Sequence, residues 1–283
     1  MSRIAIIGGG SIGEALLSGL LRAGRQVKDL VVAEKHPDRA KQLAETHSVL
    51  VTSVADAAES AAYIIIAVKP ADVEAVTGEI AAAVAGAEGS SEEQVFVSVA
   101  AGVSTTFFEA KLPAGAPVIR VMPNAPMVVG GGVSAVAAGR FATPEQVKEV
   151  TAIFDTVGDV LTVAEAQLDA VTAVSGSGPA YFFLMVEALI DAGVDVGLSR
   201  DVATELVVHT MAGSAAMLLD RRDNTPAGAM DTSAAALRAV VTSPGGTTAA
   251  GLRELERGGL RSAVSDAIAA AKTRSEQLGI TSE

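Results

Sequence analysis

Short apolar runs alternate with mixed polar and apolar stretches along the first half of the chain. The apolar runs predict strands at residues 4–7, 30–33, 63–68, 95–99 and 118–122. The stretches between them are rich in alanine and predict helices, for example at 12–23 and 38–46. Strands that are apolar throughout and separated by helices are typical of a parallel sheet covered on both faces. Two later runs, 133–138 and 160–163, are expected to extend this sheet at its edge.

The strand pattern fades from about residue 164, and the remainder of the chain predicts helices. They cover residues 180–191, 200–219, 233–241, 247–258 and 260–277. Residues 180–190 (AYFFLMVEALI) are apolar nearly all round, so this helix must be buried on nearly all sides. A helical domain of about 120 residues buries such a surface poorly on its own. We therefore expect a second copy of the chain to cover it. A polar segment, 220–231 (DRRDNTPAGAMD), is predicted to be a loop.

A glycine-rich turn, GGGSIG at residues 8–13, follows the first strand directly and opens the first helix. In this setting the pattern is the fingerprint of a dinucleotide site. Gly8 permits the tight turn, Gly10 leaves room for the pyrophosphate, and Gly13 lets helix and strand approach closely. The start of the helix, with Ser11 and Ile12, offers backbone N–H groups to the phosphates. A glycine turn without a ligand is the alternative, and the flanking strand and helix argue against it.

The fold class that follows is α/β. A Rossmann-type, doubly wound and mostly parallel sheet is expected over residues 1–163, followed by an all-α domain over 164–283. In a doubly wound sheet, ligands bind where the strands end at their carboxyl edge. The residues that follow each predicted strand are therefore the first candidates for a cofactor site.

The end of the second strand leaves the choice between NADH and NADPH open. Glu34 is an acidic residue at the position that usually takes the ribose hydroxyls of NAD, and it would repel a 2′-phosphate. Lys35, His36 and Arg39 follow at once and would attract that phosphate. An ordinary solvated helix start explains Lys35 and Arg39 equally well.

Three further strand ends supply candidates at the same edge. Ala67, Val68, Lys69 and Pro70 end a long strand, and Pro70 forces the chain to turn. Lys69 is either a catalytic acid or a charged rim residue. A second candidate segment, SVAAGV at 98–103, contains Ala100, and a third, RVMPNAP at 120–126, contains Asn124 between two prolines. The Asn124 amide could hydrogen-bond a nicotinamide carboxamide or stabilise its own turn.

Composition and charge narrow the class of partner. Apolar residues make up 49% of the 283 residues, and the net charge of -12 argues against nucleic acid and anionic membrane as partners. There are no cysteines, and the three histidines lack metal-ligand spacing, so we expect no metal site. The N-terminus lacks a signal-peptide pattern, and the uninterrupted apolar runs are too short to span a bilayer. These observations predict a soluble, cytoplasmic protein.

Two more glycine-rich segments precede helices in the second half of the chain. One is AVSGSGPAY at residues 173–181, where a proline marks a helix start. The other is VTSPGGTTAAGL at 241–252, whose backbone amides and two hydroxyls would suit a carboxylate. The second segment is the best candidate for an anion site in the helical half.

Taken in order, GGGSIG, AVKP, SVAAGV, RVMPNAP, AVSGSGPAY and VTSPGGTTAAGL resemble the pyrroline-5-carboxylate reductase family. The resemblance covers nearly the whole chain, and its specific parts are SGSGPAY and SPGGTT. It implies reduction of 1-pyrroline-5-carboxylate to L-proline with NADPH or NADH, the last step of proline biosynthesis. It also implies homodimers with interlocked helical domains, often assembled into decamers.

The resemblance further implies roles for individual residues. The amides of Gly245, Gly246, Thr247 and Thr248 would hold the substrate carboxylate, and the Thr248 hydroxyl would reach the ring nitrogen as the catalytic contact. Glu165 is expected to border the same pocket. The segment 67–70, Ala100 and Asn124 would border the cofactor, with Asn124 near the nicotinamide.

Two other kinds of protein compete with this interpretation. A β-hydroxyacid dehydrogenase or another imine reductase would carry a catalytic Lys or Asp on the long helix that begins the second domain, but 177–189 offers only Glu187 among charged residues. A non-catalytic dinucleotide sensor would need no substrate loop, so SPGGTT weighs against it.

Overall fold

The structure is a computed structural model that describes residues 2–59, 61–86, 94–224 and 233–279. The chain divides into two compact units, which are described separately. The first comprises Met1–Pro179 together with Ile268–Glu283, and the second comprises Ala180–Ala267. The domain boundary after residue 163 remains a prediction, and it follows the end of the last strand of the sheet.

The first unit contains an eight-stranded sheet with the order β3-β2-β1-β4-β5-β6-β7-β8. Its strands are β1 Ile4–Ile7, β2 Leu30–Ala33, β3 Leu50–Thr52, β4 Tyr63–Ile66, β5 Val95–Ser98, β6 Val118–Met122, β7 Gly132–Ala138 and β8 Gly158–Thr162. Every pair is parallel except β6 with β7, which is antiparallel. A doubly wound, mostly parallel sheet is thereby confirmed.

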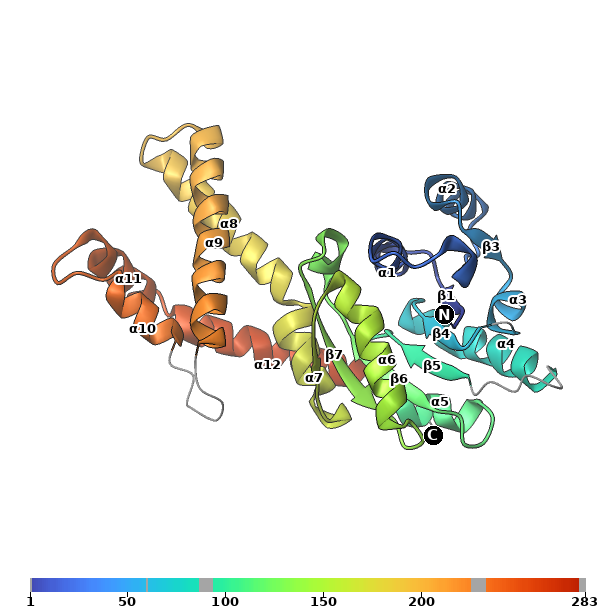
Figure 1. Ribbon diagram of the computed structural model, residues 1–283. Coiled ribbons are helices and arrows are strands. Elements are labelled where there is room, and N and C mark those ends of the chain that lie inside the picture. Colours follow the sequence, from blue (N-terminus) through green and yellow to red (C-terminus); the bar gives the residue numbers. More distant parts are fainter. Residues whose placement is uncertain (1, 60, 87–93, 225–232, 280–283) are drawn as a thin grey trace. The chain divides into compact units, whose positions relative to one another are not determined.

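Helices cover both faces of this sheet (Figure 1). They are α1 Ser11–Arg22, α2 Pro37–His47, α3 Val54–Glu59, α4 Val73–Gly86, α5 Thr105–Lys111 and α6 Pro144–Phe154. Short 3-10 turns lie at Val27–Asp29, Pro70–Asp72, Ala125–Val129, Asp155–Val157 and Glu165–Gln167.

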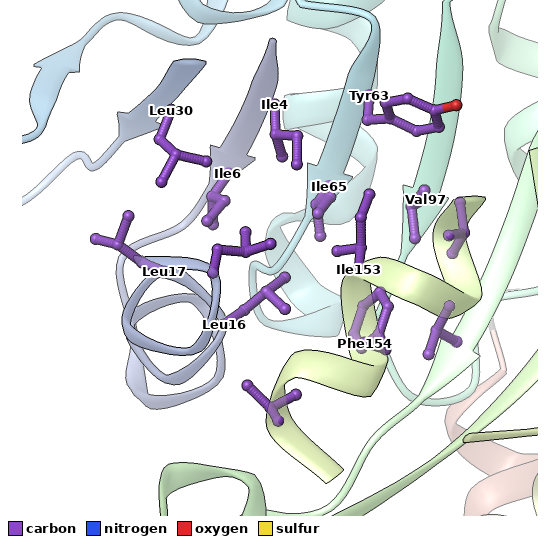
Figure 2. Packing of buried hydrophobic residues seen from close by; sticks show 14 of the residues in the cluster. Ile4, Ile6, Leu16, Leu17, Leu30, Tyr63, Ile65, Val97, Ile153 and Phe154 are labelled. Carbon is purple, nitrogen blue, oxygen red and sulfur yellow. The ribbon is translucent and has the colours of Figure 1, made fainter. Parts of the chain in front are cut away.

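Alternating strand residues build a separate core on each face. Ile4 and Ile6 of β1 point toward α1 and α6, where they pack with Leu16 and Phe154 (Figure 2). Ala5 and Ile7 belong to the cluster on the opposite face, with residues of α3, α4 and α5. This is why β1 is apolar throughout: a strand between two helical layers exposes neither face to water.

The first unit ends in irregular helix. After β8 come α7, Leu168–Val171, and a π-helical turn, Thr172–Gly176, which contains part of the SGSG motif. The end of the last helix, α12 (Leu260–Leu278), also belongs to this unit. There the Ser275 hydroxyl donates a hydrogen bond of 2.6 Å to Asp169 Oδ1.

The second unit is helical. Its elements are α8 Gly178–Asp195, α9 Arg200–Asp223, α10 Ser233–Val240, α11 Thr247–Arg257 and the first part of α12. Gly193 of α8 faces Ala203 of α9 closely, since a Cβ on the glycine would lie 3.2 Å from the alanine Cβ. Large apolar side chains of α8 are exposed in the single chain, including Phe182 (62%), Phe183 (66%) and Leu184 (67%).

Two helical segments in the described chain, Glu165–Asp195 and Arg200–Asp223, are long and apolar enough to cross a membrane by length and composition. The expectation from uninterrupted runs missed them because isolated polar residues interrupt both. Length and composition alone are weak evidence, since helices buried in soluble proteins meet the same criterion.

Most predicted elements agree with the structure to within a few residues, and two differences are informative. The edge strand β3 was not predicted, because only three residues form it and all are at least partly exposed. The loop predicted at 220–231 begins later than expected, since α9 continues to Asp223. Residues 225–231 of that loop lie outside the described residues.

Candidate functional site

The carboxyl ends of the central strands lie side by side. Ile7 of β1 is in register with Ala33 of β2 and with Ile66 of β4. The loops that follow these strands therefore meet at one edge, where they surround a cleft of about 510 Å³. Seven predicted cofactor residues line it: Gly8, Gly10, Glu34, Lys35, Ala67, Val68 and Lys69.

The three glycines of the first loop meet three different requirements. Gly8 has a φ of +109°, and a Cβ there would lie 2.6 Å from the Ala67 carbonyl oxygen. A Cβ on Gly13 would lie 2.0 Å from the Gly8 carbonyl oxygen, so α1 can approach the loop only without a side chain. Gly10 is different, because a Cβ there meets no protein atom within 4 Å. The backbone at Gly10 is thus open to a ligand.

The loop and the start of α1 fit a dinucleotide pyrophosphate. Gly10 is the N-cap of α1, and no side chain caps the helix. The N–H groups of the first turn, which includes Ser11 and Ile12, therefore have no side-chain acceptor at the cap. Such a helix start favours an anion through its N–H groups and its dipole.

Glu34 is held against the glycine loop. Its Oε2 accepts a hydrogen bond of 2.9 Å from the Gly9 N–H, and its Oε1 accepts one of 2.8 Å from the His36 N–H. Each carboxylate oxygen has further lone pairs, so Glu34 can still accept a ribose hydroxyl. Lys35 lies across the cleft edge from Asp72, with its Nζ 3.1 Å from both carboxylate oxygens.

Other predicted cofactor residues lie outside the cleft lining. Pro70 begins the 3-10 turn after β4 and so turns the chain, as expected. Ala100 is buried, and its N–H donates to the Ser98 hydroxyl at 3.3 Å. The lining includes residues that the sequence did not single out: Thr52, Ser53, Val54, Asp72, Ala75, Val76 and Glu79. Thr52 ends the unpredicted strand β3 and Ser53 follows it, so recognition of that strand would have found both residues.

Asn124 joins two of the predicted motifs. Its Oδ1 accepts a hydrogen bond of 2.9 Å from the Val133 N–H, and its Nδ2 lies 3.3 Å from the Ser175 hydroxyl. The amide therefore stabilises its turn and connects it to the SGSG segment. Any contact with a nicotinamide carboxamide would have to share these groups.

Glu165 makes contacts that sequence reasoning did not foresee. Its carboxylate accepts two hydrogen bonds of 2.6 Å from Thr105, one from the backbone N–H and one from the hydroxyl. Arg120 of β6 lies 3.6 Å from the same carboxylate and is buried. Arg120 Nη2 has no hydrogen-bond partner within the described parts of the chain. No sequence pattern pointed to this pair, because long-range packing decides which carboxylate lies beside an arginine in an apolar strand.

The SPGGTT segment lies in the second unit. Gly245 has a φ of +69°, and Gly246 is the N-cap of α11, again without a side-chain cap. The Gly246 N–H donates to the Ser243 carbonyl at 3.0 Å, so it is already used within the loop. Thr247 and Thr248 begin the helix and are exposed in the single chain. This geometry offers a carboxylate the amides of Thr247 and Thr248.

The Gly10→Ala substitution tests the cleft. We expect a rise in the dissociation constant of NADH and NADPH on the order of tenfold to a hundredfold, because the methyl group would occupy the space of a phosphate. The melting temperature should change little, since the new Cβ meets no protein atom within 4 Å. Cofactor fluorescence titration and thermal melts measure the two effects.

Gly13→Ala is the contrasting variant, and it should lower stability as well as cofactor affinity. Unchanged cofactor affinity in Gly10→Ala would contradict a pyrophosphate at this loop.

Two family descriptions match the chain. Residues 165–278 match "Pyrroline-5-carboxylate reductase dimerisation", and residues 3–102 match "NADP oxidoreductase coenzyme F420-dependent". The second description supports use of an NAD(P)H cofactor by the glycine-loop unit.

Relatives and solved structures agree with these matches over the full length. The chain is 68% identical to a pyrroline-5-carboxylate reductase of Mycobacterium tuberculosis, covering 100% of this chain and 99% of that protein. A solved pyrroline-5-carboxylate reductase of Coxiella burnetii is 32% identical, with a TM-score of 0.87 and 99% of both chains covered. The Plasmodium falciparum pyrroline carboxylate reductase, solved with NADP bound, is 28% identical with a TM-score of 0.84, covering 99% of this chain and 98% of that one. The chain therefore belongs to the pyrroline-5-carboxylate reductase family.

Proposed function

We propose that the chain reduces 1-pyrroline-5-carboxylate to L-proline with NADPH or NADH, the last step of proline biosynthesis. Family membership over the full length is the observation that carries this function. Two features of the structure support it: the cleft with its open backbone at Gly10, and the uncapped start of α11 at Gly246.

The substrate is a cyclic imine that bears a carboxylate, and the α11 loop suits its anionic end. The amides of Thr247 and Thr248, at the positive end of the helix dipole, hold the carboxylate. Gly245 and Gly246 shape the turn, since a φ of +69° favours glycine at the first position. The Thr248 hydroxyl then lies on the same turn and contacts the ring nitrogen.

When bound, the nicotinamide would supply a hydride to the carbon of the protonated imine, and the C=N electron pair would become the lone pair of the amine nitrogen. The protein residues bind and orient the two reactants, and this proximity accounts for much of the rate. Thr248 steadies the imine nitrogen with one hydrogen bond. Lys69 lines the cleft as an exposed rim residue. Glu165 supports the first unit through Thr105 and Arg120. That Glu165 also borders the substrate pocket is a proposal that rests on family membership.

Glu34 sets the balance between the two cofactors. Its carboxylate lines the cleft at the end of β2, where a ribose 2′ position is expected. Lys35, which follows Glu34 directly and also lines the cleft, is already paired with Asp72 at 3.1 Å. The negative charge of Glu34 therefore weighs against the 2′-phosphate, and we propose that it shifts use toward NADH while both cofactors are accepted.

The helical unit makes the protein a homodimer, and we propose that dimers assemble further into decamers. The dimerisation description covers α8 and α9, the helices whose apolar side chains are exposed in the single chain. A second copy that covers these side chains explains why both helices meet a length and composition criterion for membrane spans. We place the enzyme in the cytoplasm.

A direct assay tests the reaction and Thr248 together. Adding 1-pyrroline-5-carboxylate should consume NADH or NADPH, and Thr248→Ala should lower kcat/KM about tenfold to a hundredfold, roughly 1–3 kcal/mol for one lost hydrogen bond. Thr46→Ala, which removes a hydroxyl from an exposed position of α2, is the matched control. No turnover of the natural chain with either cofactor refutes the function, and wild-type kinetics in Thr248→Ala removes that residue from the site.

Replacement of Glu34 tests cofactor choice. We expect Glu34→Gln to raise the ratio of kcat/KM for NADPH to that for NADH by about tenfold, because a carboxylate near a dianion costs on the order of 1 kcal/mol even at high dielectric. The ratio isolates the charge, since any disturbance of the Gly9 contact affects both cofactors alike. Glu45→Gln, an exposed position of α2, serves as control. A constant ratio would show that Glu34 does not sense the 2′ position.

Light scattering tests the assembly. Each chain has a mass of 28.4 kDa, and we expect a multiple that corresponds to a dimer or to an assembly of dimers. A monomeric mass at micromolar concentration would refute dimerisation through the helical unit.

A further inference from the structure

A basic side chain outside the cleft lining is bound to the backbone of the glycine loop. Arg39, in the first turn of α2, donates from Nε to the Gly9 carbonyl oxygen at 2.8 Å. Its other two nitrogens donate to Glu14 Oε2 at 2.6 Å and to Gln42 Oε1 at 2.8 Å. Every nitrogen of this guanidinium is thus engaged, and Arg39 is absent from the residues that line the cleft.

These contacts point to a role for Arg39 that differs from the one expected from the sequence. From the sequence it is one of three basic residues that would attract a 2′-phosphate. In the structure it is bound to the loop backbone and to α1, through Glu14. We propose that Arg39 is a positioning residue that holds the glycine loop in its cofactor-binding shape, and that it does not bind the 2′-phosphate. The inference rests on the proposed cofactor site.

Planarity of the peptide bond explains how Arg39 can act on a ligand that it does not touch. The Gly9 carbonyl and the Gly10 N–H belong to one trans peptide, so they point in opposite directions. A guanidinium that fixes the carbonyl therefore also fixes the Gly10 N–H, which points away from Arg39. Gly10 lines the cleft, and its N–H is one of the loop amides available to a phosphate.

The backbone of the glycine loop needs such restraint from other residues. Gly8, Gly9 and Gly10 have no side chains to restrict their backbone, and glycine loses more conformational freedom on ordering than any other residue. Two side chains limit the loop from outside: Glu34 accepts the Gly9 N–H, and Arg39 donates to the Gly9 carbonyl. Two successive peptides are held in this way. Close packing adds to the restraint, since a Cβ on Gly9 would lie 2.3 Å from Leu43 Cδ1.

Glu14 anchors the arginine. Its carboxylate lies between Arg39 and His47, whose Nε2 is 3.1 Å from Oε1. The hydrogen bond from Arg39 lowers the pKa of Glu14, which partial burial would otherwise raise. The carboxylate is therefore ionised at neutral pH and holds the guanidinium in one orientation. A charge-assisted contact of this kind is stronger than a neutral hydrogen bond.

Direct binding of the two cofactors tests the proposal without relying on turnover. The Arg39→Met substitution keeps the apolar stem and removes all donors. We expect the dissociation constants of NADH and of NADPH, measured by nicotinamide fluorescence, to rise by the same factor of about tenfold. In the kinetics, the cofactor KM should rise likewise while kcat stays within about twofold, because the reacting groups are untouched.

Lys41→Met is the matched control. It removes a positive charge from the same helix, but its side chain is 75% exposed and contacts Glu45 at 3.8 Å. Its affinity for both cofactors should equal that of the natural chain. Two milder variants guard against a folding defect: Arg39→Lys, which can reach one acceptor at a time, and Glu14→Gln, which removes the anchoring charge. Both variants should weaken the binding of NADH and of NADPH by the same factor, and by a smaller factor than Arg39→Met.

Three outcomes would overturn the proposal. Loss of NADPH affinity alone would make Arg39 a ligand of the 2′-phosphate. A lower melting temperature with unchanged dissociation constants would make it a stabilising residue without influence on the loop. Unchanged affinity and stability in all three variants would leave it no role at the site. Failure of the natural chain to bind either cofactor would instead refute the proposed function.

Discussion

The close contact between bare backbones at the first β-α junction is the constraint on which the cofactor site depends. Gly13 approaches the Gly8 carbonyl so closely that a Cβ would lie 2.0 Å from it, and Gly8 approaches the Ala67 carbonyl in the same way. These contacts bring α1 against β1 and bring the loop after β4 against both. The cleft exists because three chain segments meet there with no side chains between them. A single methyl group at Gly8 or Gly13 would push these segments apart.

Burial of the strands and the spacing of the glycines explain how far the sequence predicts the fold. Continuous apolar runs located seven of the eight strands. Six of the seven are mostly buried, so solvent exposure does not interrupt their pattern. The seventh, β8, is an edge strand without a buried residue, and its short apolar run was enough to locate it. Strand β3 lies at the edge, and its three residues are at least partly exposed, so the pattern is missing. The cofactor loop was also predictable, since the spacing of its glycines reflects backbone geometry that is local in sequence.

Side-chain partners were far less predictable than backbone shape. Glu34, Arg39 and Asn124 were singled out as ligand contacts, and each is engaged within the protein. Their partners come from other segments of the chain, such as the glycine loop, α1 and the SGSG turn. Arg120 and Glu165 are 45 positions apart in the sequence and 3.6 Å apart in the fold. A residue type in a suitable position predicts what it can bind, but long-range packing decides what it does bind.

The two glycine loops share one feature, the absence of a side-chain cap on the helix that follows. Both α1 and α11 begin after a glycine N-cap that provides no side-chain acceptor. An aspartate or serine at either position would satisfy the first-turn amides and so remove them from a ligand. Each helix thereby forgoes a side-chain cap that contributes about a few tenths of a kcal/mol relative to glycine in other proteins, and its first-turn amides stay open to an anion. The loop before α1 needs support from Glu34 and Arg39 because three successive glycines precede the helix. The loop before α11 has Pro244 and the hydrogen bond from Gly246 to Ser243, which restrict its backbone from within. One loop is therefore held from outside and the other by its own residues, although both present the same kind of surface to an anion.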